Sequence, residues 1–341
     1  MLILLTILLL AIFILPLISE KVESNLEIFL LIMGFLCVIV SKTLTIDLII
    51  HIFENKFLYI IAFTVLIGGL LFNYFRNSVI KFFDILLNKV SIKIIVFTLI
   101  VVLGLLSSVI TAIIAALLLV EFIHFLPLKR KNKIIINIIA CYSIGLGAAL
   151  TPIGEPLSTI IVSKLNVGFM YIFNLIGIYI IPIIIILGIL GAFFAVVDTD
   201  KDDSSENIIN EEESNKDIVI RAVKVFIFIF ALELLGQGFK PIIDEYVLTL
   251  DGKILYWVNM LSAVLDNATL ASAEISPQMS ALQIKAILMG LLISGGMMIP
   301  GNIPNIISAN KLKIKSKEWI RFGVPLGFII LFIIFIVLFF L

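Results

Sequence analysis

Long apolar runs dominate this chain and restrict the folds that are open to it. Apolar residues make up 62% of its 341 residues, against roughly 45 to 50 per cent in a soluble domain. A helix that crosses the hydrocarbon layer of a bilayer needs about 20 consecutive apolar residues, and the sequence offers many such runs. We therefore expect an all-α, multi-pass protein of the cell membrane, with membrane lipids as its surroundings.

The charged and sulfur-containing residues exclude several other classes. Twenty-four basic residues balance twenty-four acidic ones, so the net charge predicts no nucleic-acid partner. Two cysteines and two histidines are too few for a disulfide framework, a zinc site or a haem site. An intramembrane protease would need a motif such as GxGD or HExxH, and neither occurs. We expect neither an enzyme nor a cofactor.

The first part of the sequence predicts uninterrupted helices. The next part has apolar runs that are too long or are broken. Helices are expected at about 1–18, 26–42 and 57–75, and residues 1–56 form an N-terminal unit of transmembrane helices. The first run has no basic start and no cleavage site, so we expect it to be retained. After a mixed segment at 76–89, the run 92–126 is too long for one span and predicts a re-entrant hairpin. The run 134–165 is broken at TPIGEP, and a helix follows at about 169–197.

An acidic segment separates this first half from a second one. Residues 198–218 are nearly all polar, which is typical of a solvated linker. Beyond it the same order recurs: a helix at 219–237, a hairpin candidate at 254–272, a broken run at 281–310 and a last helix at 320–341. The units are therefore 57–197 and 219–341.

The amino-acid sequences of the two halves can also be aligned. LSSVITAIIAA, residues 106–116, aligns with LSAVLDNATLA, residues 261–271, at an offset of 155. GEPLSTIIVSKL, residues 154–165, aligns with GNIPNIISANKL, residues 301–312, at an offset of 147. The basic stretches at 76–93, 129–133 and 311–321 fit one topology only if the halves are inverted. Inverted repeats with paired broken helices are typical of secondary transporters.

The interruptions of the two broken runs predict the functional site. Proline removes a backbone donor and glycine permits unusual backbone angles, so both runs should unwind within the membrane. The residues responsible are Pro152, Gly154 and Pro156 in the first half and Pro300, Gly301 and Pro304 in the second. Unwinding exposes carbonyls and helix ends that can replace water around an ion. The competing interpretation is a pair of proline kinks without a ligand.

Two acids at these points predict cation chemistry. Glu155 lies in the first break and Asp266 at the tip of the second hairpin, and acids at membrane depth are usually retained for function. The accompanying oxygen and amide groups are Asn267, Thr269, Thr151, Ser158, Thr159, Asn302 and Asn305. Hard cations prefer such ligands, so we expect sodium at Asp266 and Glu155, with Asp266 as the chief ligand. Asp266 could instead cap a helix in an external loop.

The segments SAVLDNATL, TPIGEPLSTI and PGNIPNIISANKL resemble the ion-transporter superfamily, which includes D-type sodium/proton antiporters and arsenite exporters. More closely, the chain is similar to a family of uncharacterised prokaryotic membrane proteins labelled putative cation transporters. The resemblance covers about residues 57–341 and implies two inverted halves, each with a re-entrant hairpin and an unwound helix. Asp266 and Asn267 match the Asp-Asn pair of the D-type antiporters, whereas Glu155 stands where an Asn is common.

The leading expectation is a secondary transporter that exchanges a monovalent cation, sodium first, for protons. Burial disfavours the charged form of a carboxylate, so protons and cations would compete for the same acids. The alternative is an exporter or symporter of an oxyanion or organic acid, for which the site lacks basic groups. The expected substrate is a small inorganic ion, and the sequence leaves a homodimer open.

Overall fold

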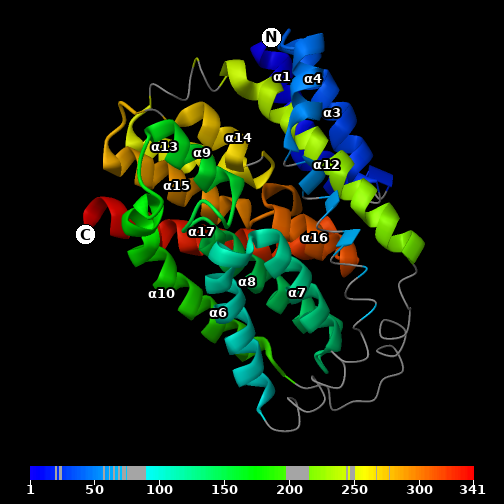
Figure 1. The fold of residues 1–341 in the computed structure, drawn as a ribbon, viewed down its shortest axis with the longest axis vertical. Coiled ribbons are helices and arrows are strands. Elements are labelled where there is room, and N and C mark those ends of the chain that lie inside the picture. The colour runs from blue at the N-terminus through cyan, green and yellow to red at the C-terminus, as the bar shows by residue number, and fades with distance from the viewer. Residues whose placement is uncertain are drawn as a thin grey trace.

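The computed structural model describes residues 1–19, 21–22, 25–56, 90–196, 215–242, 250–265, 267–275 and 277–341, with residue 245 and scattered positions between 58 and 74. Every regular element of these residues is a helix (Figure 1), so the all-α expectation is confirmed for them. Several expectations fall outside the described residues. They are Asp266, the side chain of Thr269, the segment 76–89, most of the helix at 57–75 and the linker up to 214.

Within the described residues, three helices are long and apolar enough to cross a membrane: α6 (Ile92–Ile110), α10 (Tyr171–Phe194) and α17 (Ser316–Phe340). Shorter apolar helices in the same ranges include α3 (Leu26–Val40), α7 (Ala112–Phe125) and α15 (Ala281–Gly295). The side chains that these helices turn outward are largely Ile, Leu and Phe. The chain therefore has the helices and the apolar surface of a membrane protein.

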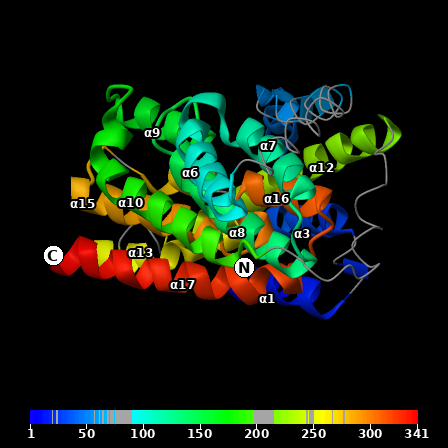
Figure 2. The same cartoon turned by 90° about the horizontal axis from the view of Figure 1, so that it is seen from below.

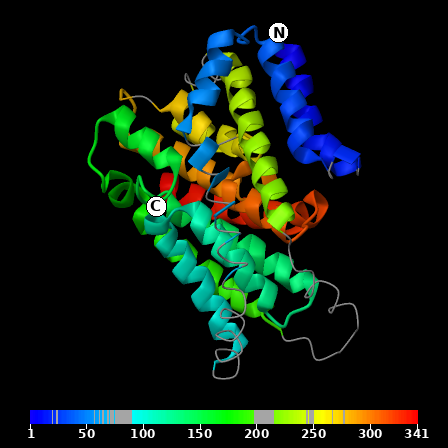
Figure 3. The same ribbon diagram turned by 45° about the vertical axis from the view of Figure 1, so that its right-hand side comes forward.

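The N-terminal helices form one group with α12. This group contains α1 (Leu2–Ile18), α3, α4 (Ile46–Glu54) and α12 (Asn215–Ile242), and α12 lies along α3 (Figures 1 and 3). The helices approach closely because Gly34 of α3 faces Leu234 and Gly238 of α12 faces Cys37. Small residues allow such contact between membrane helices.

The structure adds a helix to this group and moves the start of another. The segment 46–54 was not expected to be helical, yet it forms α4, which Thr45 caps by accepting a hydrogen bond from the Leu48 N–H at 3.0 Å. Its three ionisable residues interrupt the apolar pattern on which the helix assignments depended. The linker was expected to reach residue 218, but α12 begins at Asn215, so the last residues of that segment are helical.

The first half runs through α6, α7, α8 (Arg130–Ala148), α9 (Pro156–Leu165) and α10. A single residue, Thr111, separates α6 from α7, and its φ of 77° makes the turn sharp. The second half runs through α13 (Gly252–Val258), η2 (Asn259–Ala263), α14 (Asn267–Glu274), α15, η3 (Ile299–Gly301), α16 (Ile303–Lys311) and α17. Each half thus has a hairpin, a broken helix and a long final helix, in that order.

The first parts of the two broken helices form the centre of the molecule. Every residue from Ile134 to Ala148 in α8 is buried, and so is every residue from Ala286 to Gly295 in α15. Helix α17 runs along one side of the molecule, with α1 near its start (Figure 2). A helix that is buried on all sides belongs to the interior, although α8 carries Asn137, Ser143 and two glycines there.

The two halves pack against each other through equivalent helices. Within the first half α6 packs on α8, and within the second half α13 and η2 pack on α15. Between the halves α7 packs on α16, and α14 packs on α9. The second arm of each hairpin therefore lies against the second part of the other half's broken helix.

Salt bridges and hydrogen bonds bring two of the basic stretches to one end of the molecule, which we call the basic end (residues 129–133 and 311–321). Arg130 pairs with Glu318 and donates to the Lys313 carbonyl at 3.0 Å. Lys311, at the end of α16, pairs with Glu121 of α7 at 3.6 Å. Helices α8 and α17 therefore begin at the basic end, whereas α7 and α16 finish there.

Other contacts define the opposite end. Lys253, in the first turn of α13, lies over the ring of Phe340 at 5.0 Å, near the end of α17. Gly252 packs near Gln283 in the first turn of α15. Helices α13 and α15 therefore begin at the end where α17 finishes.

Candidate functional site

The two broken helices are interrupted at equivalent places. In the first half, α8 ends at Ala148 and α9 begins at Pro156, and we call residues 149–155 the first break. In the second half, α15 ends at Gly295 and α16 begins at Ile303, and we call residues 296–302 the second break. Pro152 and Gly154 lie in the first break and Pro300 and Gly301 in the second, while Pro156 and Pro304 lie in the first turns of α9 and α16. A proline is well tolerated at the start of a helix because no donor is needed there.

Two hydroxyl groups of the first half donate to backbone carbonyls, one near the end of α6 and one in the first break. Thr151 donates to the Ser108 carbonyl, and Ser158 donates to the Ala149 carbonyl at 2.7 Å. These hydroxyls were expected to be ion ligands. The structure uses their protons to hold the unwound backbone, because buried carbonyls need donors.

Thr159 also differs from the expectation. It is exposed, and its hydroxyl donates to the Pro152 carbonyl at 2.6 Å. One helical step rotates the side chain by about 100°, so Thr159 turns outward while its neighbour Ser158 is buried. Thr159 therefore lies apart from the buried residues of the first break, and its role as a ligand stays a prediction.

The second break is held by an asparagine. The Nδ2 group of Asn305 donates to the Gly295 carbonyl at 2.8 Å and to the Met298 carbonyl at 2.9 Å. Asn305 is fully buried, and its Oδ1 atom receives no hydrogen bond from the residues that the structure describes. Both protons of this amide thus stabilise the break, and the bare oxygen remains as an acceptor.

The offset of 147 pairs the residues of the two breaks. In this alignment, Glu155 corresponds to Asn302 and Ser158 corresponds to Asn305. Glu155 and Asn302 have similar exposed fractions, 7% and 6%. The Glu155 carbonyl accepts from the Ser158 N–H at 3.2 Å, and the Asn302 carbonyl accepts from the Asn305 N–H at 3.1 Å. The two breaks therefore repeat one backbone arrangement with different side chains.

The hairpins repeat a contact in the same way. Ser107 of α6 donates to the Ile144 carbonyl of α8 at 3.0 Å, and Ser262 of η2 donates to the Leu291 carbonyl of α15 at 3.1 Å. The serines are related by the offset of 155, and the carbonyls by the offset of 147. One pattern of hydrogen bonds thus joins each hairpin to its own broken helix.

Small residues bring the expected asparagines to the second break. A Cβ atom at Gly145 of α8 would overlap the Asn302 amide, so only glycine leaves room for it. A Cβ atom at Gly295 would lie 2.9 Å from Nδ2 of Asn267, and the Asn267 amide contacts the Ser262 hydroxyl. Asn267, Asn302 and Asn305 therefore surround the second break. Glu155, Thr151 and Ser158 belong to the first break, and the packing of α14 on α9 connects the two sets.

Two buried polar groups were not expected. Glu274 of α14 is 2% exposed and accepts a hydrogen bond from Asn259 of η2 at 2.8 Å. Asn137 of α8 donates to Ser308 of α16 at 3.0 Å, and its Oδ1 atom has no partner among the described residues. The four-residue spacing of Asn137, Cys141 and Gly145 puts them on one face of α8, and this spacing is the signal that could have indicated them.

No three His, Cys, Asp or Glu side chains gather into a metal-binding group within the described ranges. The expected sodium pair, Asp266 and Glu155, involves a residue outside those ranges and stays a prediction. The oxygens that the structure places near the second break come from amides and the backbone. Such ligands suit a hard cation more than a transition metal.

Comparison with known proteins places the chain in one family. Residues 2–341 match the family described as "Protein of unknown function (DUF1646)". The chain belongs to this family. No curated protein matches the chain. The match spans both halves and the N-terminal helices.

Proposed function

We propose that this protein is a secondary transporter that exchanges a monovalent cation, sodium first, for protons across the cell membrane. The proposal places the ion near the second break, with Asp266, Asn305 Oδ1 and Asn302 as ligands and Glu155 of the first break assisting. Asp266 and Glu155 are the groups that bind or release the proton.

The observation that carries this proposal is the bare oxygen of Asn305. A buried polar atom without a hydrogen bond costs about 1 to 3 kcal/mol, and a carboxamide oxygen can be satisfied only by a donor or a cation. Both donors of this amide already bind the unwound backbone, so the oxygen is fixed in place. The sequence has no Lys, Arg or His from 145 to 163 or from 286 to 310, and this absence favours a positively charged ligand.

The directions of the helices relative to the two ends of the molecule support an inverted arrangement of the two halves. Helix α8 leaves the basic end and is followed by the first break, whereas α16 follows the second break and returns to that end. The first hairpin finishes at the basic end with α7, and the second hairpin begins at the opposite end with α13. Two halves of opposite direction can expose one central site to each side in turn.

Cysteine labelling tests this arrangement. We expect a cysteine at Lys317 to react only from the cytoplasmic side and a cysteine at Gln278 only from outside, because the basic end should face the cytoplasm. Both positions are exposed, and the native Cys37 and Cys141 are buried. Labelling of intact and opened cells with a membrane-impermeant maleimide measures the two sides. Reaction of both positions from one side would refute the inverted topology.

One observation favours the alternative substrate class, an oxyanion or organic acid. Nδ2 of Asn267 is a buried donor that has no acceptor in the described part of the chain. An anion could accept from this group, as could a water molecule. The bare acceptor of Asn305 and the absence of basic residues in the breaks weigh against an anion, and flux measurements separate the two classes.

Purified protein in liposomes with an enclosed pH dye tests the function directly. Imposing a gradient of sodium, lithium or potassium chloride should drive proton movement for at least one cation and not for choline. Replacing chloride by sulfate or citrate should leave that flux unchanged. Proton flux that depends on the anion and not on the cation would favour the alternative, and no flux under any gradient would contradict both.

A further inference from the structure

Helices α8 and α16 meet along a row of buried polar side chains that the proposed cation site does not use. The row consists of Asn137 and Cys141 of α8 and Ser308 of α16, and all three are 0% exposed. Asn137 lies beside Ser308, while Gly145 lies beside Asn302, so the two helices are antiparallel. The row, which we call the α8–α16 row, therefore begins next to the second break and runs toward the basic end.

The hydrogen bonds of the row leave one acceptor without a donor. The Ser308 hydroxyl accepts from Nδ2 of Asn137 at 3.0 Å and donates to the Asn305 carbonyl at 3.2 Å. The sulfur of Cys141 lies 3.2 Å from the Ser308 oxygen and 3.7 Å from the Pro304 carbonyl oxygen. Oδ1 of Asn137 has no hydrogen-bond partner among the described residues. The contacts of the row therefore fix the Asn137 amide and leave its oxygen bare.

A bare oxygen of the same kind lies one turn away on α16. Asn305 precedes Ser308 by three residues, which is about 4.5 Å along the helix axis, and its Oδ1 atom is also buried without a donor from the described residues. Two carboxamide acceptors thus lie along one contact between helices, one at the second break and one nearer to the basic end. A cation or a water molecule can satisfy such an acceptor. The sequence has no Lys, Arg or His from 134 to 163 or from 286 to 310, so no basic side chain of these segments fills the row.

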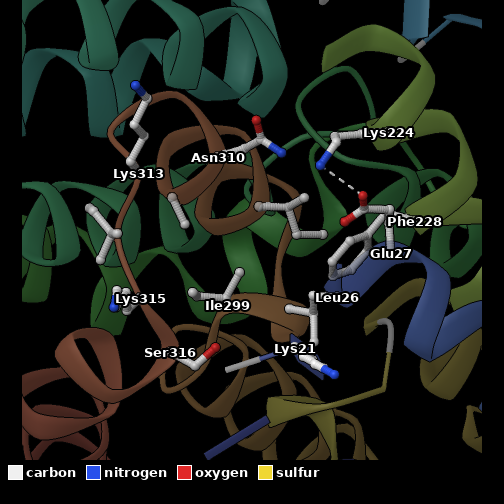
Figure 4. Close-up of a pocket in the computed structure, with 13 residues that line it drawn as sticks. Lys21, Leu26, Glu27, Lys224, Phe228, Ile299, Asn310, Lys313, Lys315 and Ser316 are labelled. Atoms are coloured by element: carbon white, nitrogen blue, oxygen red, sulfur yellow. Dashed lines mark ion pairs between the residues drawn. The ribbon is translucent and has the colours of Figure 1, made fainter. Parts of the chain in front are cut away.

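The row is separate from a pocket that lies on another face of α16. That pocket, of about 670 Å³, is lined by Ile306, Ala309 and Asn310 of α16 and contains the pair of Glu27 and Lys224 at 2.9 Å (Figure 4). None of the described residues that line it belongs to the row. The groups that decide what the row binds are therefore its own oxygens and sulfur.

We propose that the α8–α16 row binds a monovalent cation and is a second site on the path of the transported ion. Asn137 Oδ1 is its first ligand, and the Ser308 oxygen and the Asn305 carbonyl oxygen, each with two lone pairs, are the next ones. Hard cations take oxygen ligands, and the row contains no carboxylate, which favours a single positive charge. A succession of weak sites lets an ion bind and leave again. This inference rests on the proposed function, because that function identifies the ion.

The two native cysteines supply a reporter and its matched control. Cys141 belongs to the row, whereas Cys37 lies against Gly238 where α3 packs on α12. Both thiols are free and buried. The test uses two single-cysteine proteins, Cys37→Ala and Cys141→Ala, as full chains in a neutral detergent. N-ethylmaleimide alkylates the remaining thiol, and mass spectrometry gives the rate in sodium, lithium, potassium or choline chloride at one ionic strength.

We expect the transported cation to protect Cys141 from alkylation. The rate should fall about tenfold when the cation is present at about ten times its dissociation constant. The rate at Cys37 should change by less than about twofold, because a cation in the row does not touch that thiol. A general tightening of the protein would slow both thiols alike, so the ratio of the two rates reports on the row alone.

Substitutions of Asn137 should change this protection in opposite directions. Asn137→Asp adds a negative charge to the oxygen ligand, so the protecting cation concentration should fall roughly tenfold, since ligand charge tunes cation affinity. Asn137→Leu removes the oxygen and should remove the protection. Ser143→Ala is the control, because Ser143 is buried on the same helix but its hydroxyl donates to the Ile100 carbonyl of α6 at 2.9 Å. This control should keep the protection of the parent protein.

Two further measurements cover variants that fold or react poorly. If Asn137→Leu does not fold, the direction of the change in Asn137→Asp decides. If Cys141 is not alkylated in choline chloride, the sodium concentration that gives half of the rise in unfolding temperature replaces the rate. That concentration should be lower in Asn137→Asp than in the wild type, and an equal value would refute the second site.

A rate at Cys141 that is the same in all four chlorides would overturn the inference and assign the Asn137 oxygen to a buried water molecule. This result is distinct from a failure of the proposed function, which the liposome assay tests. Cation-dependent proton flux without protection of Cys141 would keep the exchanger and refute the second site. Protection of Cys141 without flux under any gradient would keep the cation site and refute the exchange.

Discussion

Asp266→Asn is expected to abolish cation-dependent proton flux while leaving the protein folded. Asparagine keeps the size of the side chain but removes its negative charge and its exchangeable proton, so the cation loses its strongest ligand. The liposome assay with a pH dye measures the flux, and size-exclusion chromatography verifies the fold.

Asp251→Asn is the control for this variant. Asp251 caps α13 by accepting from the Lys253 N–H at 2.8 Å, and asparagine caps a helix about as well as aspartate. Flux in this control should match the wild type. Glu155→Gln should weaken the apparent cation affinity without abolishing transport, because Glu155 assists. Normal coupled flux in Asp266→Asn would refute the assignment and transfer the role to Glu155 or the buried Glu274.

Asn305→Ala is expected to lower stability and to remove the stabilisation that the transported cation provides. The variant leaves the Gly295 and Met298 carbonyls without their donor, and each unsatisfied buried carbonyl costs about 1 to 3 kcal/mol. The free energy of unfolding should therefore fall by about 2 to 6 kcal/mol. Thermal unfolding with and without sodium chloride, compared with choline chloride, measures both effects.

Asn310→Ala, at the exposed end of the same helix, separates a local effect from a general one. Its stability should stay within about 0.5 kcal/mol of the wild type. Its sodium-induced shift should also be unchanged. A full sodium-induced shift in Asn305→Ala would exclude the Asn305 oxygen as a ligand, whatever the loss of stability.

Features that act locally in the sequence could be predicted. Pro152, Gly154, Pro300 and Gly301 act on their own backbone, and both helices are interrupted around them. The alignment of the halves was also informative, because its two offsets match the hydrogen bonds of Ser107 and Ser262. A serine that repeats at a fixed offset can repeat its contact when the surrounding helices repeat as well.

Features that depend on how distant segments meet could not be predicted. Glu274 reads as a loop residue because a short polar sequence follows it, but its burial depends on Asn259 across the hairpin. Thr159 and Ser158 are neighbours in sequence, and only the rotation of α9 decides which one faces inward.

The reciprocal packing of the hairpins and broken helices has a consequence for assembly. Ala112 and Ala116 of α7 are buried, and so are Leu157 and Ile161 of α9, and both helices pack on helices of the second half. A fragment that ended before the acidic linker would leave these surfaces without cover. We therefore expect that the first half reaches its final packing only after the ribosome has made the C-terminal half.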